Sequence, residues 1–549
     1  MIIGKRFSRI RFDPVSGIQE FRSLKPRKVK RYGNGDRPKK ILLVAPRHPE
    51  NFWAMQGTVE ILGTKTLMPN AALATLMAMT PAGVDIEYAL CDENVAPIDF
   101  YPECDLVAVT GATIHAERIH ELCRVFRSQG LQVALGGTYA TIEGESCRDL
   151  ADYLFIGEAE YTWPKFLGQW VHGRAESLYE QHEYVDITDS PAPDWSLLEI
   201  EDYVNINVQS SRGCPNQCDF CDVIQYGGRI YRNKTVDQVL TEVRNAHRVG
   251  ARTVFFSDDN FLGNKPFTKK LLSRLKAWNV SQTRPLSFST QITVQVADDE
   301  DLLKLFADCR FSVLFLGVET VREKSLEEVH KTQNLKHDIY ERIKRISRYG
   351  LVPFIGLIVG FDHDDPTVFD DLCHFMHSTH SPIAGISLLN APKNTPLYKR
   401  LKKEGRIATE PFSGEWQLYS NVIPKQMSRE ELNGHYWKLF RKIYEPARFE
   451  ARLEEWLKNI RYANDEYTRR KTDPRQLLYG CRIFKHFILK ENPEIRSLFF
   501  RTLRKTWIIN PKLIRRYFSL ITQYSHFYHF VNRNRNPGRH RPAAASPPC

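Results

Sequence analysis

Apolar runs and amphipathic stretches alternate along the first third of the chain. Residues 39–46 (KKILLVAP) form a short, nearly continuous apolar run, which is typical of a strand buried on both faces of a parallel sheet. Helical and strand patterns then alternate through residues 72–95, 104–141 and 153–170. We therefore predict a doubly wound parallel sheet over residues 38–170, with its ligand site at the carboxyl ends of the strands.

A second alternating series follows a proline-rich segment. We interpret residues 171–198, which contain DITDSPAPDWSLL, as a linker. The alternation within residues 199–400 predicts a partial (β/α)6 barrel of the TIM type, with function on the loops that follow the strands. The six strand patterns are residues 205–213, 253–261, 287–293, 312–320, 354–362 and 385–392.

Strand patterns end near residue 400. Residues 401–465 predict a helical extension, and residues 466–549 predict a basic, aromatic helical tail with a disordered end. Residues 1–37 form a basic leader. The predicted fold class is therefore α/β, with two sheet domains followed by helices.

Composition places the chain among folded globular proteins, with 42% hydrophobic and 26% charged residues. The first residues lack the pattern of a secretory signal, and no run of about 18 apolar residues occurs. We expect a cytoplasmic protein, with peripheral attachment at the inner membrane surface as the alternative. Eleven cysteines, scattered except for one cluster, indicate reduced thiols rather than a disulfide framework.

Positive charge is confined to the two ends. Residues 1–40 carry 13 Lys and Arg against 3 acidic residues, and residues 470–549 carry 17 against 3. The region between them has 47 basic and 59 acidic residues. The acidic centre does not favour a polyanionic partner, whereas the ends do.

The cysteine cluster lies in SSRGCPNQCDFCDV, where Cys214, Cys218 and Cys221 have the spacing C-x3-C-x2-C. Structural zinc needs four protein ligands, and the nearest downstream histidine, His247, lies beyond a predicted helix. A three-cysteine 4Fe-4S cluster leaves one iron without a protein ligand, and that iron is free to bind an exogenous amino acid. The spacing favours the iron–sulfur cluster, with zinc as the alternative.

Other polar and glycine residues stand at the ends of predicted barrel strands. Ser257, Asp258 and Asp259 follow one strand directly, where they would bind a ligand or simply cap a turn. Glu319 ends another strand. Asn390 stands at the end of the last strand, where it would bind a ligand or simply form part of a turn. Gly356 and Gly360 would allow a ligand to approach the backbone closely.

The cysteine spacing, Phe220 before the last cysteine, and the position after the first barrel strand resemble the radical S-adenosylmethionine (SAM) superfamily. The resemblance implies that the three cysteines bind a 4Fe-4S cluster whose open iron binds SAM. It also implies that an external electron donor reduces the cluster and that a 5′-deoxyadenosyl radical attacks an unactivated carbon.

The leading domain resembles the cobalamin-binding module of one radical SAM subclass. Its polar turn would be Thr110 and Gly111, and its glycine pair would be Gly136 and Gly137, followed by Thr138. The Asp-x-His-x-x-Gly loop of many cobalamin proteins is missing, so we interpret His48 in PRHPENFW as a loop histidine rather than a cobalt ligand.

The order of motifs over residues 38–460 resembles the hopanoid C-2 methylase family. That resemblance implies a cobalamin-dependent methyltransferase that acts on a lipid, isoprenoid or tetrapyrrole carbon. Two departures, MPNAAL at residues 68–73 and Gln291 where an acidic residue is common, argue against carrying over the hopanoid substrate itself. The alternatives are a radical SAM cyclase or rearrangement enzyme, and a zinc-holding adaptor for nucleic acid or membranes.

The basic tail allows three interpretations. Its helices could pack their aromatic residues on the barrel, lie in an anionic membrane interface, or hold single-stranded nucleic acid. Packing is the simplest interpretation, membrane contact is next, and nucleic acid is the least favoured.

Overall fold

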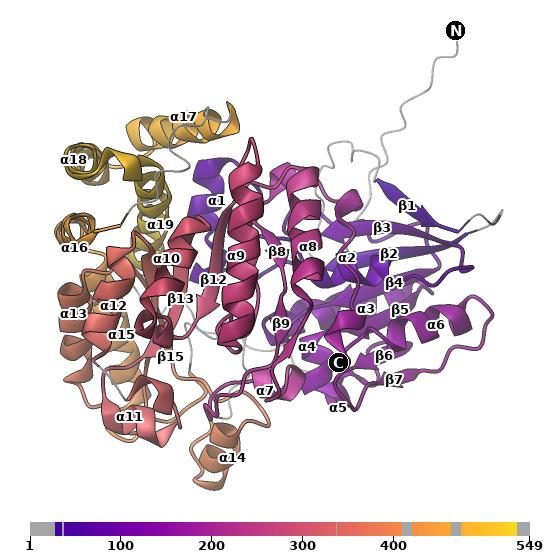
Figure 1. Ribbon diagram of the computed structural model, residues 1–549. Coiled ribbons are helices and arrows are strands. Elements are labelled where there is room, and N and C mark those ends of the chain that lie inside the picture. The colour runs from indigo at the N-terminus through magenta and orange to yellow at the C-terminus, as the bar shows by residue number, and fades with distance from the viewer. Residues whose placement is uncertain are drawn as a thin grey trace.

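The chain folds into two α/β sheets followed by a helical C-terminal region (Figure 1). The computed structural model describes residues 28–33, 35, 38–335, 338–408, 420–462 and 474–534. In Figure 1 the first sheet lies on the right, the second lies in the centre, and the C-terminal helices lie on the left and at the upper left. Parts of the predicted leader and of the predicted disordered end, residues 1–27 and 535–549, lie outside the described residues.

The first sheet has seven strands in the order β1-β3-β2-β4-β5-β6-β7, and β1 alone runs antiparallel to its neighbour. The strand order reverses between β2 and β4, because β3 lies on the other side of β2. This reversal creates the crevice in which open α/β sheets bind ligands. The strands are β1 Val29–Tyr32, β2 Lys39–Ala45, β3 Ile86–Asp92, β4 Leu106–Thr110, β5 Gln132–Gly136, β6 Tyr153–Ile156 and β7 Leu178–Glu180.

The predicted doubly wound sheet is confirmed, with short strands added at both edges. β1 lies in the segment predicted as a leader, and β7 lies in the segment predicted as a linker. Both strands are too short, at four and three residues, to show a periodic pattern in the sequence. The first sheet therefore uses residues on both sides of the range 38–170.

The second sheet has six parallel strands in the order β15-β14-β13-β12-β11-β8. All six predicted barrel strands are confirmed, and β8 and β15 form the edges of this open partial barrel. A short ribbon of β9 (Ser211–Arg212) and β10 (Arg232–Asn233) follows β8. The six strands are β8 Ile206–Val208, β11 Thr253–Phe256, β12 Ser287–Ile292, β13 Phe311–Glu319, β14 Val352–Val359 and β15 Ile383–Leu388.

The outer face of the second sheet is packed against helices, whereas much of its inner face is not fully buried. Leu314 and Leu316 of β13 belong to the core, but the alternate residues Val313, Phe315 and Gly317 are half-buried. The neighbouring strand β12 shows the same alternation. The inside of the partial barrel is therefore open enough to receive a ligand. The surrounding helices are α8 Val236–Val249, α9 Lys265–Ser281, α10 Glu300–Asp308, α12 Ile339–Arg348 and α13 Val368–Thr379.

The predicted helices after the barrel are confirmed within the described residues. They include α15 Arg429–Ile443, α16 Pro446–Asn459, α17 Pro474–Leu489, α18 Pro493–Ile509 and α19 Ile514–Arg533. α19 buries Tyr517, Tyr524 and Phe527 in the main core. The expectation that aromatic residues of the tail pack inward is confirmed for this helix.

α19 also ties the C-terminal region to the first domain. His526 Nε2 lies 2.8 Å from the Phe52 carbonyl oxygen, and the Gly57 amide donates to His526 Nδ1 at 3.2 Å. Phe52 belongs to the short 3-10 helix η1 (Phe52–Ala54), and Gly57 belongs to α1 (Gln56–Leu62). One histidine thus holds two consecutive segments of the first domain.

Trp53, also in η1, reaches from the first domain to the second sheet. Its ring centre lies 5.2 Å from that of Phe315 and 5.8 Å from that of Phe354. A Cβ at Gly385 of β15 would lie 2.4 Å from the Trp53 ring. The missing side chain at Gly385 is therefore what lets the indole pack against the barrel.

Candidate functional site

The three clustered cysteines lie in the loop that follows β9, at the carboxyl end of the first barrel strand. Cys218 is buried, and Cys214 and Cys221 are half-buried. The Cys214 amide donates to the Gly228 carbonyl at 3.0 Å, and the Cys221 amide donates to the Cys218 carbonyl at 3.2 Å. The loop backbone is therefore fixed by its own hydrogen bonds before any ligand binds.

Burial disfavours ionisation of the Cys214 and Cys221 thiols. It raises the pKa of Cys221 to about 12 and also raises the pKa of Cys214. A thiolate in this loop needs a compensating positive charge. A bound metal supplies that charge, and the thiols that coordinate it therefore lose their protons. The donor set therefore suits iron–sulfur ligation rather than free reactive thiols.

The described residues contain no group of three or more His, Cys, Asp or Glu side chains arranged to hold one metal ion. In a cubane cluster each cysteine binds a different iron, so three cysteines need not converge on one point. A structural zinc ion requires convergence of four ligands. Zinc stays the alternative to an iron–sulfur cluster at this loop.

A buried lysine, which the sequence did not reveal, lies beside the cysteine loop. Lys331 Nζ is 2.6 Å from Glu319 Oε1 and 6.0 Å from the ring centre of Phe220. Burial alone would lower the pKa of Lys331, but the negative charges of Glu319 and of a Cys218 thiolate raise it above its usual value. Gln333, two residues after Lys331, also contacts the cysteine loop, because its side-chain amide donates to Cys218 Sγ at 3.5 Å. No motif marks this loop, so spacing alone could not have found it.

Glu319 ends β13 in the left-handed backbone region, with a φ of 66°. That conformation is uncommon for a residue other than glycine, asparagine or aspartate. A Cβ at Gly317 would lie 2.5 Å from Glu319 Oε1 and 3.1 Å from Lys331 Nζ. The glycine thus makes room for the ion pair at the mouth of the barrel.

The two predicted carboxylates after β11 bind the protein backbone. Asp258 is fully buried and accepts hydrogen bonds from the Ser210 amide at 2.6 Å and from the Ser211 amide at 2.8 Å. Asp259 Oδ2 accepts from the Gly213 amide, next to Cys214, at 2.8 Å. These carboxylates fix the start of the cysteine loop. Direct cofactor contact by Asp258, Asp259 or the preceding Ser257 stays a prediction.

Burial raises the pKa of Asp258 to about 7, while the Ser210 and Ser211 hydrogen bonds oppose that shift. Gln291, the departure noted in the sequence, donates to the Asp258 carbonyl at 2.7 Å. An acidic side chain at position 291 would place its oxygens against that carbonyl. Gln291 is therefore a structural partner of the strand end in this chain.

Gly356 lies inside β14, and Gly360 and Asn390 lie just after β14 and β15. Gly356 is in register with Gly317 of β13 and with Gly385 of β15, so the three glycines form a row across three strands. Gly360 has a φ of 107°, which favours glycine. Asn390 accepts a hydrogen bond from the Asn421 amide at 3.2 Å and so contacts the segment after α14 (Pro396–Lys403). A cofactor role for these residues stays a prediction.

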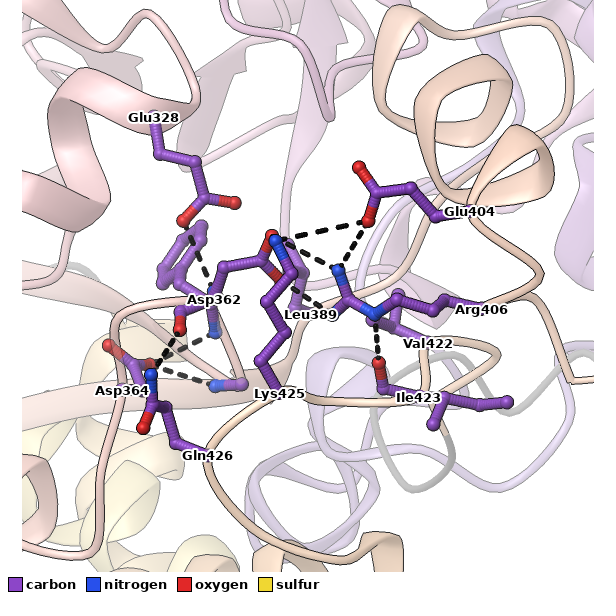
Figure 2. A network of polar contacts seen from close by, with 12 residues as sticks. Glu328, Asp362, Asp364, Leu389, Glu404, Arg406, Val422, Ile423, Lys425 and Gln426 are labelled. Atoms are coloured by element: carbon purple, nitrogen blue, oxygen red, sulfur yellow. Dashed lines mark hydrogen bonds and ion pairs between the residues drawn. The ribbon is translucent and has the colours of Figure 1, made fainter.

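A polar network fixes the segments around β14 (Figure 2). Asp362 is buried and contacts Arg400 at 2.7 Å, Arg406 at 2.5 Å and Lys425 at 2.9 Å. Although burial opposes it, these cations keep the pKa of Asp362 well below its usual range. Burial and the Asp362 charge raise the pKa of nearby Glu328 to about 7. The network ties α14 and residues 422–426 to the end of β14.

The predicted cobalamin-contact residues meet at the ends of β4 and β5. Thr110 is in register with Gly136, and a Cβ at Gly137 would lie 2.5 Å from Thr110 Oγ1. Gly137 has a φ of 95° and directly precedes the short helix α4 (Thr138–Ile142). The Tyr139 amide donates to the Gly111 carbonyl at 3.0 Å. Because Gly137 has no side chain, the turn after β5 packs directly against the turn after β4.

A cavity of about 250 Å³ lies at the switch point of the first sheet. It takes lining residues from the ends of β2, β3 and β4, and Asn207 of β8 lines it from the second sheet. Thr110 is the predicted contact residue that lines it. The lining residues are Ala45, Pro46, His48, Met68, Pro69, Asn70, Ala71, Asp92, Asn94, Thr110, His115 and Asn207.

Two histidines of this cavity form a hydrogen-bonded pair. His115 Nδ1 accepts from the Ala112 amide at 3.0 Å, and His115 Nε2 lies 2.9 Å from His48 Nδ1. Burial lowers the pKa of His115 to about 4, so it is neutral at pH 7. A neutral His115 therefore carries its proton on Nε2 and donates it to His48.

The hydrogen bonds from the Ala112 amide to His115 and from His115 to His48 also determine which nitrogen of His48 carries its proton. Because Nδ1 of His48 accepts, the neutral ring carries its proton on Nε2, and no partner within the described residues takes that proton. A nitrogen that bears a proton is a hydrogen-bond donor and not a metal ligand. That His48 does not ligate cobalt stays a prediction, and this proton position is an argument for it.

Two family models match the chain. The radical SAM superfamily matches residues 208–376, and a domain of unknown function, DUF4070, matches residues 395–538. The first match covers the barrel from β8 to α13, including the three cysteines, and the second covers the C-terminal helices.

Characterised and uncharacterised methyltransferases are among the similar proteins. The chain is 34% identical to an uncharacterized methyltransferase of Synechocystis sp., over 74% of this chain and 76% of that protein. It is 31% identical to the hopanoid C-2 methylase of Rhodopseudomonas palustris, over 68% of this chain and 72% of that protein.

A similar solved structure is that of the radical SAM methyltransferase TsrM from Kitasatospora setae, with cobalamin and a [4Fe-4S] cluster bound. The match has a TM-score of 0.57 at 13% identity and covers 90% of this chain and 99% of that one. At this identity the likeness supports the fold, including the order of the sheet domain, the barrel and the helices.

Proposed function

The chain belongs to the radical SAM superfamily, in the group that includes hopanoid C-2 methylase, and on that premise we propose that it is a cobalamin-dependent methyltransferase. Its substrate would be an unactivated carbon of a lipid, an isoprenoid or a tetrapyrrole. The observation that carries the proposal is the cavity at the switch point, which Asn207 connects to the barrel strand that leads into the cysteine loop.

Cys214, Cys218 and Cys221 would hold the 4Fe-4S cluster, and an external electron donor would reduce it. Phe220, Glu319, Gly356, Gly360 and Asn390 are the proposed surroundings of SAM. When bound, the cluster with SAM would supply a 5′-deoxyadenosyl radical and the cobalamin would supply a methyl group. The role of the chain is to hold these groups, to orient the substrate between them and to exclude water.

Lys331 supports the cluster site through charge. Its ammonium group is buried beside Cys218 and next to Glu319, so it offsets negative charge that thiolate ligands would bring into the loop. Asp259 holds the backbone at Gly213, one residue before the first cysteine. These residues position the ligands without needing to contact SAM.

The first domain offers a fitting surface for a corrinoid. The Thr110 and Gly137 turns form a cradle that a Cβ would fill, and amide, hydroxyl and imidazole groups line the adjoining cavity. A cavity of about 250 Å³ accommodates part of a corrinoid rather than the whole molecule. We propose that Thr110, Gly111, Gly136, Gly137 and Thr138 contact the cobalamin and that His48 donates a hydrogen bond to it.

The inner surface of the barrel favours a largely apolar substrate. Val313 and Phe315 of β13 form an apolar part of this surface, and the Trp53 ring packs against it near Gly385 of β15. Ser287 and Ser289 of β12 form a more polar side. A mostly hydrocarbon skeleton with a few polar groups would match this division.

Cells with and without the gene provide the test of methyl transfer. Mass spectra of small-molecule and lipid extracts are expected to differ by a compound heavier by one methyl group when the gene is present. Protein reconstituted without oxygen is expected to show corrin absorbance. Cleavage of SAM to 5′-deoxyadenosine with no methylated product would instead indicate cyclisation or rearrangement, and zinc without iron would indicate an adaptor.

A further inference from the structure

The outer faces of α17 and α18 expose large hydrophobic side chains. Of the fourteen exposed large hydrophobic residues in the described part of the chain, seven fall on these two helices. Leu489, Trp507 and Ile508 are the most exposed of the seven, at 66% or 67%. Both helices lie at the upper left edge of the molecule (Figure 1). The seven are Leu477, Leu478, Ile488, Leu489, Phe500, Trp507 and Ile508; we refer to them as the α17–α18 face.

Packing inside the protein does not account for these residues. α17 already buries Ile483 and Phe487 in the main core, so its inner face is satisfied. A helix that is apolar on both faces is normally covered on both. Seven large apolar side chains exposed on two neighbouring helices are more than single scattered residues, and such a surface usually contacts something other than water.

The charge around the α17–α18 face indicates its partner. Residues 474–534 contain 12 Lys and Arg against two acidic residues, Glu491 and Glu494. Of these cations, Arg475, Arg501 and Lys505 pair with acidic residues of other elements, which leaves a basic excess. Glu491 is buried, whereas Lys485 and Arg504 are exposed on the same helices. Two copies of so basic a surface would repel one another, so the complementary partner is anionic.

The side chains favour lipid over nucleic acid. Single-stranded nucleic acid is held mainly by aromatic stacking, but five of the seven exposed residues are aliphatic and only Phe500 and Trp507 are aromatic. Leu, Ile, Phe and Trp beside Lys and Arg form the composition with which helices lie in a membrane interface. No helix among the described residues is long and apolar enough to cross a bilayer, so contact through this face would be peripheral.

We propose that the α17–α18 face docks on the surface of an anionic phospholipid membrane. The apolar side chains would enter the interface, and Lys485 and Arg504 would lie at the level of the lipid headgroups. This docking goes beyond methyl transfer and does not require it. It would place the enzyme next to a hydrophobic substrate.

The test is co-flotation of the full-length protein with vesicles in the absence of SAM and substrate. Wild-type protein is expected to float with phosphatidylcholine vesicles that contain phosphatidylglycerol and, at low salt, to bind pure phosphatidylcholine at least about tenfold more weakly. The double variant Trp507→Glu/Ile508→Glu is expected to lose affinity about tenfold or more, because two apolar side chains no longer enter the interface.

Val29→Glu serves as the matched control, because Val29 is 58% exposed on β1 of the first sheet, outside the α17–α18 face. This variant should bind anionic vesicles like the wild type. Trp507→Ala/Ile508→Ala should weaken binding less than the glutamate pair. Circular dichroism melting curves of all variants check that they are folded.

Three results would overturn the proposal. Equal binding to neutral and anionic vesicles would remove its electrostatic basis, and unchanged binding by the glutamate pair would show that another surface is used. Loss of a homodimer or of single-stranded DNA binding in the same variant, without vesicle binding by the wild type, would assign the face to those partners. Because the assay contains no substrate, its outcome is separate from that of the methylation experiment.

Discussion

At the residue scale, the ion pair of Lys331 and Glu319 sets the charge beside the cysteine loop. Both side chains are nearly buried, at 11% and 10% exposure, and Nζ and Oε1 lie 2.6 Å apart. Removing one partner from such a pair leaves an uncompensated buried charge, which costs more than removing both partners.

We predict that Lys331→Met lowers the free energy of unfolding by about 3–5 kcal/mol and reduces iron bound per chain after anaerobic reconstitution. The double variant Lys331→Met/Glu319→Gln should regain most of the stability but not the iron, because the thiolates still lack their cationic neighbour. Denaturant unfolding and iron analysis measure the two effects. Equal destabilisation by the single and double variants would contradict the role of the pair.

His48 provides a second prediction at this scale. In protein loaded with cobalamin and reduced to Co(II), the electron paramagnetic resonance spectrum should show no splitting from a histidine nitrogen, because the relay from Ala112 through His115 leaves the proton on His48 Nε2. His48→Ala should weaken cobalamin binding by roughly 2- to 10-fold through loss of one hydrogen bond. A nitrogen triplet that disappears in His48→Ala would show that the imidazole ligates cobalt.

Single residues were predictable where spacing in the sequence carries the chemistry. Cys214, Cys218 and Cys221 are close in sequence, so their shared loop could be inferred directly. Lys331 meets Cys218 only through the fold, and His48 meets His115 across 67 positions. Neither contact leaves a periodic or compositional trace.

At the scale of elements, hydrophobic patterning predicted the strands well, because the buried strands of parallel sheets read as apolar runs. The short edge strands β1 and β7 were missed for the lack of such a run. Patterning also predicted C-terminal helices, but it could not indicate which of their apolar faces is exposed.

The turn between α17 and α18 contains a pH-sensitive carboxylate. Glu491, whose side chain is 1% exposed, contacts His486 at 3.1 Å, His529 at 2.8 Å and Ser525 at 2.5 Å. Burial works to raise its pKa, but these hydrogen bonds lower the pKa of Glu491 to about 2. A depressed pKa contributes stability above the unfolded value near 4.3, and the contribution is lost as pH falls toward the folded value.

Glu491→Gln should therefore remove up to about 3 kcal/mol of unfolding free energy at neutral pH, and the difference from wild type should shrink between about pH 5 and pH 3. Urea unfolding at several pH values measures it. Glu494→Gln, an exposed neighbour, is the control and should follow the wild-type curve. A difference from wild type that does not change with pH would exclude ionisation of Glu491 as the cause.

At the scale of the whole molecule, Trp53 and α19 join the two sheet domains. Trp53 packs on Phe315 and Phe354, and its ring occupies the place of a side chain at Gly385. Phe52, next to it, contacts Phe527 of α19 at 5.9 Å between ring centres. These contacts hold the cavity of the first domain and the cysteine loop in a fixed arrangement relative to one another.

Gly385→Ala is expected to cost about 1–3 kcal/mol, because the added methyl group overlaps the Trp53 ring. Trp53→Leu should relieve that cost in the Gly385→Ala background while lowering stability on its own. Gly434→Ala in α15, where a Cβ meets nothing within 4 Å, should instead stabilise by about 0.5–1 kcal/mol. Additive effects of Gly385→Ala and Trp53→Leu would mean that the two positions do not share this contact.

One measurement tests directly whether the cysteine loop holds a cluster that activates SAM. Formation of 5′-deoxyadenosine from SAM is followed under strictly anaerobic conditions for reconstituted wild type, Cys218→Ala and Cys373→Ala, a control cysteine buried to a similar degree. We expect the wild type and Cys373→Ala to form the product and Cys218→Ala to lose at least about 100-fold in rate, which corresponds to about 2.7 kcal/mol in the barrier. Undiminished product formation by Cys218→Ala would contradict the account.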